Sequence, residues 1–218
     1  MRREYRLRWT FFIVGLIVLA FGVALTIKGK VFGIGPWDVF HYGLYKQLGL
    51  TIGMWSIIAG MIIIISTWIG TKTPPKIGAI ANMLLLGIFI DIFNALLPTP
   101  EAFIVQLIFF IVGVLILGFG ISLYVSANLG AGPRDSLMLL IVEKTGWSIT
   151  LVRNGMEITV FLLGWLLGGP VGIGTIFIAF FLGKIIQVTL PPCQKWLAYL
   201  VGKGQVNPHI ASEKKEII

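Results

Sequence analysis

The stretch Gly33-Ile-Gly-Pro-Trp-Asp38 returns 97 residues later as Gly130-Ala-Gly-Pro-Arg-Asp135. The residues before each stretch also repeat, since 11–27 and 109–125 match at 9 of 17 aligned positions. Apolar composition alone does not easily place a Gly-x-Gly-Pro-x-Asp motif at the same point of two copies. The sequence therefore predicts an internal repeat, with a first half over residues 9–98 and a second half over 103–192.

Each Gly-x-Gly-Pro-x-Asp motif predicts a break in the chain followed by a new helix. The second glycine permits a sharp bend, and the proline suits a first helical position, where no N–H is needed. The aspartate then lies in the first turn, near free N–H groups and the positive end of the helix dipole. The motif residues are Gly35, Pro36 and Asp38 in the first half and Gly132, Pro133 and Asp135 in the second.

Composition places the chain in a membrane. Of its 218 residues 57% are hydrophobic and only 12% charged, and the mean hydropathy is +0.95. So apolar a chain cannot cover itself with a polar surface in water. The net charge of +8 comes largely from basic termini and needs no nucleic-acid partner. Because no zinc-ligand spacing, nucleotide-binding motif or nucleophile–base arrangement is present, we expect no enzyme activity, cofactor or metal.

Each half contains three apolar segments long enough to cross a bilayer and one shorter stretch. The short stretches, 36–49 and 133–146, are too short for a clean crossing. The predicted fold is therefore an all-α bundle of six transmembrane helices, arranged as two inverted three-helix repeats, each with a re-entrant half-helix. The long segments are 9–27, 51–71, 77–97, 103–126, 148–167 and 172–192.

Eight crossings with parallel halves are the alternative topology. In the internal loops, six crossings put four basic residues inside and three outside, whereas eight crossings put two inside and five outside. The positive-inside rule thus favours six crossings. It also puts the basic N-terminus (1–8) and the tail (193–218) in the cytoplasm and the loop 99–102 outside.

Charged side chains within spans usually face the bundle interior or a wet cavity. Arg153 and Glu157 share one face of a helix, and Glu157 and Lys184 lie at similar depths. We therefore expect Glu157 and Lys184 to approach each other, either as a structural ion pair or as part of a substrate or proton site. The four intramembrane charges are Asp91, Arg153, Glu157 and Lys184.

Two interpretations of the paired motifs stay open at this point. They are either helix caps alone or the two sides of a binding site, because broken helices at matching positions of an inverted repeat are typical of transport sites. The second interpretation adds His41 and Arg134, which differ between the copies, to the candidate site. Helix N-termini favour an anion and the aspartates a cation, so the charge of a solute stays open.

The stretches GIGPWDV and GAGPRDS, each after an FGxxL-type helix in a chain of this length, resemble the YczE-like branch of the bacterial YczE/YyaS/YitT membrane proteins. The resemblance covers residues 9–192. It implies a multi-pass protein of the bacterial plasma membrane and brings neither a substrate nor catalytic residues.

The leading hypothesis is a transporter or channel for a small polar or charged solute. The alternatives are a membrane protein that assists or regulates a partner, and the substrate-binding subunit of a multi-subunit importer. Besides the lipid bilayer, the expected partners are the solute, a second copy of the chain or another protein.

Overall fold

The computed structural model describes residues 2–130 and 132–202, and every regular element within these ranges is a helix. The elements are α1 (Arg2–Lys28), the short 3-10 helix η1 (Lys30–Phe32), α2 (Pro36–Leu48), α3 (Ile52–Thr71), α4 (Ile77–Leu96), α5 (Phe103–Ser126), α6 (Pro133–Thr145), α7 (Ile149–Leu166) and α8 (Ile173–Val201).

Among the described residues, six helices are long and apolar enough to cross a membrane, namely α1, α3, α4, α5, α7 and α8. The other two α-helices, α2 and α6, have 13 residues each and so reach only about 20 Å. The predicted all-α class and the six candidate spans are confirmed, and both short helices begin at the motif prolines, as expected.

The first and last helices extend beyond the predicted spans. Helix α1 begins at Arg2 instead of residue 9, and Arg8 fixes this extension by an ion pair with Glu4 and a hydrogen bond to the Ala127 carbonyl. Helix α8 continues to Val201 instead of ending at 192, because its final turns pack on α1 through Trp196 and Phe11, whose ring centroids are 5.1 Å apart. Residues 203–218 of the predicted tail lie outside the described ranges.

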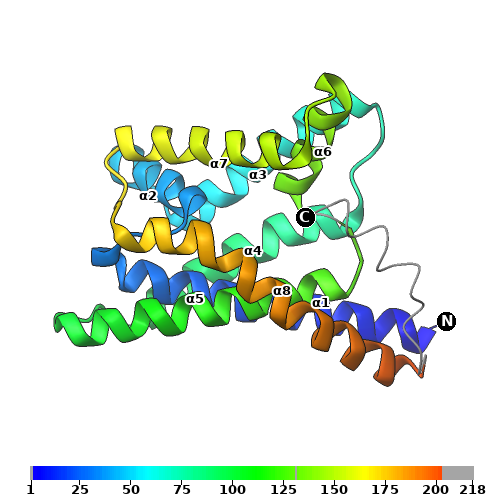
Figure 1. Ribbon diagram of the computed structural model, residues 1–218, viewed down its shortest axis with the longest axis horizontal. Coiled ribbons are helices and arrows are strands. Elements are labelled where there is room, and N and C mark those ends of the chain that lie inside the picture. The colour runs from blue at the N-terminus through cyan, green and yellow to red at the C-terminus, as the bar shows by residue number, and fades with distance from the viewer. Residues whose placement is uncertain (1, 131, 203–218) are drawn as a thin grey trace.

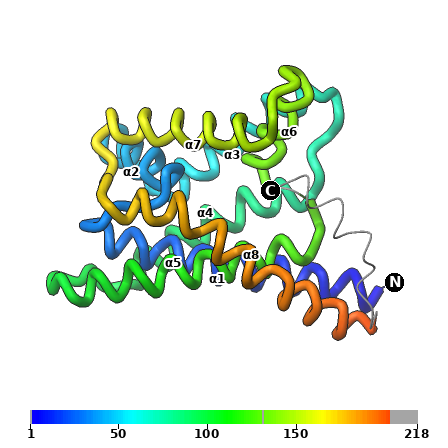
Figure 2. The backbone as a smooth tube through the Cα atoms, viewed as in Figure 1, coloured from blue at the N-terminus to red at the C-terminus, as the bar shows by residue number. Residues whose placement is uncertain are grey.

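The helices form two groups that run side by side (Figure 1). Helices α1, α5 and α8 lie together along one side, and α2, α3 and α7 along the other. Helix α4 joins the groups because it packs on both α1 and α3. The backbone tube shows α1 and α5 running in opposite directions next to each other (Figure 2).

Glycines allow α1 and α5 to pack backbone against backbone. Gly22 of α1 faces the backbone of Leu117, and Gly120 of α5 faces the backbone of Leu19. A Cβ atom built on Gly22 would lie 2.5 Å from the Leu117 nitrogen. Gly15 and Gly113, one heptad earlier in each helix, also approach the opposite helix closely, since their Cβ atoms would lie 2.4 Å and 2.9 Å from the nearest atoms. This tight seam supplies much of the apolar core.

Each motif loop packs against the start of a helix from the other half. Gly33 lies against residues 172–175 at the start of α8, and Gly130 lies against residues 76–79 at the start of α4. Both glycines have positive φ, +91° and +138°, a conformation that side chains other than glycine rarely adopt. The two chain breaks therefore lie in matching surroundings, each against the first turn of a helix from the other half.

The halves differ in how their last two helices meet. In the first half, Gly87 of α4 approaches the Gly53 carbonyl and Ile57 of α3 closely. In the second half, α7 and α8 diverge from their connecting turn (Figure 1), and a Cβ atom on Gly183 of α8 would meet nothing within 4 Å. The first half is thus closed along α3 and α4, whereas α7 and α8 stay apart.

We predict that Gly22→Ala destabilises the protein by about 1–3 kcal/mol, because an added methyl group forces the α1 and α5 backbones apart. Gly183→Ala is the matched control, since it adds the same methyl group in open space and improves helix propensity by up to about 1 kcal/mol. Thermal unfolding of both variants in detergent measures the difference. Equal melting temperatures would contradict the tight α1–α5 seam.

Candidate functional site

The first turns of α2 and α6 form the centre of the candidate site. Gly35 and Gly132 are the N-cap residues, and each is followed by proline at the first helical position. Gly35 leaves room for the Asp38 carboxylate, since a Cβ atom there would lie 2.9 Å from Asp38 Oδ2. The motif therefore turns each aspartate back toward its own helix N-terminus, where a negative charge is stabilised.

The two motifs meet through the residue that differs between them. The Arg134 guanidinium of α6 lies over the indole ring of Trp37 of α2, 4.4 Å from the ring centroid. The Trp37 indole N–H in turn donates a hydrogen bond of 3.1 Å to Glu157 Oε1 of α7. Trp37 is only 6% exposed, so its ring joins three helices away from solvent. A cation over a desolvated indole contributes about 2 kcal/mol.

Asp38 and His41 lie on the buried side of α2. Asp38 is 8% exposed and within electrostatic range of Arg134 and Glu157. His41 is 2% exposed, and within the described part of the chain neither ring nitrogen has a hydrogen-bond partner. An unpartnered buried polar group costs about 1–3 kcal/mol, and such groups call for a structural or functional explanation.

Asp135 occupies the matching place on α6. Its carboxylate accepts a hydrogen bond from the Gly132 backbone and interacts electrostatically with Arg153 of α7 and with Arg134. The Asn82 side chain of α4 is next to the same turn, because its Oδ1 would lie 3.5 Å from a Cβ atom on Gly132. Asn82 is itself 6% exposed. The carboxylate of Asp135, the guanidinium of Arg134 and the amide of Asn82 therefore gather around the first turn of α6.

We call the charged and aromatic side chains around the two motifs the central cluster, whose members are given at the end of this paragraph. It brings together three carboxylates, two guanidinium groups, one imidazole and one indole, of which Trp37, Asp38 and His41 are buried and the others are partly or fully exposed. Such a group of charged side chains within apolar segments is uncommon in a membrane protein. Within residues 2–130 and 132–202, no group of three or more His, Cys, Asp or Glu side chains is placed to hold a metal ion. The central cluster comprises Trp37, Asp38, His41, Arg134, Asp135, Arg153 and Glu157.

Six of these seven side chains are candidates from the sequence, whereas the role of Trp37 is not predicted. Trp37 is one of seven tryptophans, and tryptophans near the ends of spans ordinarily anchor a helix at the membrane interface. Its position in the motif opposite Arg134 was the available signal. The partnership of these two residues depends on how the halves pack.

The expected approach of Glu157 and Lys184 is not found, because the structure gives each a different partner. Glu157 accepts the Trp37 hydrogen bond, and the Lys184 ammonium lies 5.2 Å from the centroid of Phe181 on its own helix. Because α7 and α8 diverge, Glu157 and Lys184 lie apart although they are at similar depths along their helices. Asp91 also lies apart from the cluster, since it accepts hydrogen bonds from the Thr51 hydroxyl and the Gly53 N–H at the start of α3.

Residues 6–191 match the model of a protein family described as a family of unknown function, DUF6198. The chain belongs to this family. It is 53% identical to the uncharacterized membrane protein YczE of Bacillus subtilis strain 168, over 93% of this chain and 94% of that protein. An uncharacterized protein of Haemophilus influenzae is 37% identical over 80% of this chain and 79% of its own. The uncharacterized protein YyaS of Bacillus subtilis is 27% identical over 85% of this chain and 93% of its own.

The predicted resemblance to the YczE-like proteins is thereby confirmed. No solved structure matches the chain. The membrane-protein relative and the six long apolar helices both indicate a multi-pass membrane protein.

We predict strong coupling between Asp38 and Arg134. Arg134→Gln removes the guanidinium that lies over Trp37 and acts electrostatically on the buried Asp38 carboxylate, and should destabilise the protein by about 2 kcal/mol. Adding Asp38→Asn should recover part of that loss, because one buried carboxylate is then neutral. Thermal unfolding of the two single variants and the double variant forms a double-mutant cycle. Strictly additive effects would show that the two side chains do not interact.

Proposed function

We propose that this protein is a small-solute transporter or channel of the bacterial plasma membrane, with the central cluster as its solute site. The two halves are inverted repeats, α2 and α6 are re-entrant half-helices, and both termini are cytoplasmic. The observation that carries the proposal is the contact between the two broken-helix N-termini at Trp37 and Arg134.

The antiparallel course of α1 and α5 supports the inversion. Four crossings per half would leave the first helices of the halves parallel, whereas three crossings make them antiparallel. The contacts between α1 and α5 are symmetric under the repeat. Gly22 is equivalent to Gly120 and Leu19 to Leu117, and Gly22 approaches Leu117 just as Gly120 approaches Leu19. A two-fold axis that relates the halves would pass through this seam.

The contact between Trp37 and Arg134 supports a site between the halves. These residues occupy the same position of the two motifs, so their contact lies where the same two-fold axis would pass. Irregular backbone inside a membrane survives only where it is buried in protein or lines a cavity. Two such breaks that meet over buried charges are the arrangement that transport sites use.

Helix α7, together with α2, is the element best placed to move. It carries Arg153 and Glu157 of the central cluster and buries only Val152 and Gly164 among its own residues. It does not pack along α8 but packs closely on α2, since a Cβ atom on Gly164 would lie 2.4 Å from the Phe40 nitrogen. A joint shift of α2 and α7 would therefore carry Trp37 away from Arg134 without breaking the α1–α5 seam. Movements of this kind expose a site in many transporters.

Cysteine labelling tests the inverted topology. With Cys193 replaced by alanine, single cysteines at Lys72 and Glu101 are treated in intact cells with a thiol reagent that does not cross membranes. We predict that position 101 reacts and that position 72 reacts only after permeabilisation. Labelling of 72 and not of 101 in intact cells would mean eight crossings and parallel halves, and would remove the shared site.

Binding and flux measurements test the function itself. The purified protein is screened by thermal shift against amino acids, carboxylates, amines and sugars, and each solute that raises the melting temperature is then used in a proteoliposome flux assay. We predict that Asp38→Asn and Asp135→Asn each weaken binding by about tenfold or more. The control is Glu101→Gln, which neutralises an exposed carboxylate far along the chain from both motifs.

The accessory-protein and importer-subunit alternatives give different results in the same experiment. An accessory protein would show no solute response, would tolerate both aspartate variants and would co-purify with a partner. An importer subunit would bind solute alone but would carry it across the vesicle membrane only with an ATPase partner.

A further inference from the structure

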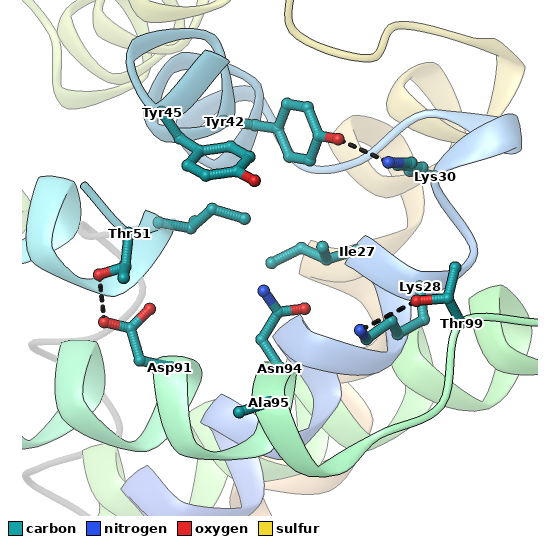
Figure 3. A pocket seen from close by; sticks show the side chains of 11 residues that line it. Ile27, Lys28, Lys30, Tyr42, Tyr45, Thr51, Asp91, Asn94, Ala95 and Thr99 are labelled. Atoms are coloured by element: carbon teal, nitrogen blue, oxygen red, sulfur yellow. Dashed lines mark hydrogen bonds between the residues drawn. The ribbon is translucent and has the colours of Figure 1, made fainter. Parts of the chain in front are cut away.

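A second polar cavity lies away from the central cluster. It is open on one side, has a volume of about 370 Å³ and is lined by the end of α1, η1, the second half of α2, the start of α3, the end of α4 and Thr99 (Figure 3). Cavities that hold small ligands start at roughly 300 Å³. Its walls combine apolar side chains, among them Ile27 and Ile52, with Lys28, Lys30 and Asp91.

The one carboxylate of this cavity is already engaged in the fold. Asp91 Oδ2 accepts a hydrogen bond from the Thr51 hydroxyl, and Oδ1 accepts one of 2.8 Å from the Gly53 N–H. Thr51 is also the N-cap of α3, since its hydroxyl accepts from the Met54 N–H. Asp91 thus stabilises a helix N-terminus, and its negative charge is balanced there by the helix dipole.

The two lysines, by contrast, have no carboxylate partner for their positive charge among the described residues. Lys28 Nζ donates to the Thr99 hydroxyl at 3.3 Å, and Lys30 Nζ donates to the Tyr42 hydroxyl at 2.5 Å. Neither forms an ion pair with a described carboxylate. Because an ammonium group carries three N–H donors, each lysine retains donors for a further partner.

The remaining polar groups complete the cavity. Figure 3 shows the Asn94 amide and the Tyr45 hydroxyl pointing into the space that faces the lysines. Neither side chain takes part in a hydrogen bond with the rest of the described chain, so both offer donors to a ligand. Ile27, Ile52 and Ala95 supply apolar surface for a carbon body.

We propose that this cavity binds a small organic carboxylate. Its anionic oxygens would lie between the Lys28 and Lys30 ammonium groups, with Asn94 and Tyr45 as further donors and the carbon body against the isoleucines. The proposal does not rest on transport, because it concerns a different cavity and requires only binding.

The test is calorimetric binding to the purified protein in a neutral detergent at low, matched ionic strength. The probes are succinate and benzoate, with glycine as a zwitterionic comparison. We expect Lys28→Gln and Lys30→Gln each to weaken carboxylate binding by about tenfold or more. Lys46→Gln is the matched control, because Lys46 belongs to the same helix as Tyr45 but bonds to the Gly168 carbonyl and does not line the cavity.

Asp91→Asn separates an anion site from a site for zwitterions. It keeps an oxygen for the Gly53 N–H but removes the negative charge, so it should tighten carboxylate binding by about threefold or more. Glycine binding that weakens in Asp91→Asn, or absence of binding by both carboxylates, would overturn the proposal. A response to phosphatidylglycerol in nanodiscs without a response to either carboxylate would also overturn it, since the lysines would then serve lipid headgroups.

Discussion

The close antiparallel packing of α1 on α5 is the constraint on which the rest of the structure depends. Glycines spaced by seven residues in each helix let the two backbones approach without intervening side chains. In a bilayer such packing is a main source of helix association, because lipid tails are as apolar as leucine. Helices α4 and α8 then pack on α1 and α5 respectively, which brings their first turns against the two motif loops.

The motif loops place irregular backbone inside the packed helices. Each loop interrupts a helix inside an apolar protein, where exposed N–H and C=O groups would be costly. The first turns of α8 and α4 pack closely on the two loops, and each new helix begins at proline, which has no N–H to satisfy. The helix N-termini so produced attract the carboxylates of Asp38 and Asp135, and Arg134 over Trp37 balances part of that charge. A polar centre thus follows from the way in which the helices are broken.

Side-chain size explains why α3 packs closely on α4 whereas α7 and α8 stay apart. Gly53 and Gly60 let α3 approach α4, since both glycines face α4 side chains at short range. At an offset of 97 the same positions of α7 are Thr150 and Glu157, which are too bulky for the same approach. Glu157 instead reaches Trp37 of α2. The second half therefore has, in place of a packing glycine, a carboxylate that accepts a hydrogen bond from α2, and α7 stays apart from α8.

The sequence by itself determined the class of protein, the six long apolar helices, the two short helices that begin at Pro36 and Pro133, and most side chains of the central cluster. These are local properties of composition, segment length and turn chemistry, which a repeated motif makes visible. Only the tertiary structure decided the pairing of Trp37 with Arg134, the separation of Glu157 from Lys184, and the lysine-lined cavity beside Asp91. Such contacts depend on how helices from different parts of the chain cross, and depth along a helix does not specify which neighbour a side chain meets.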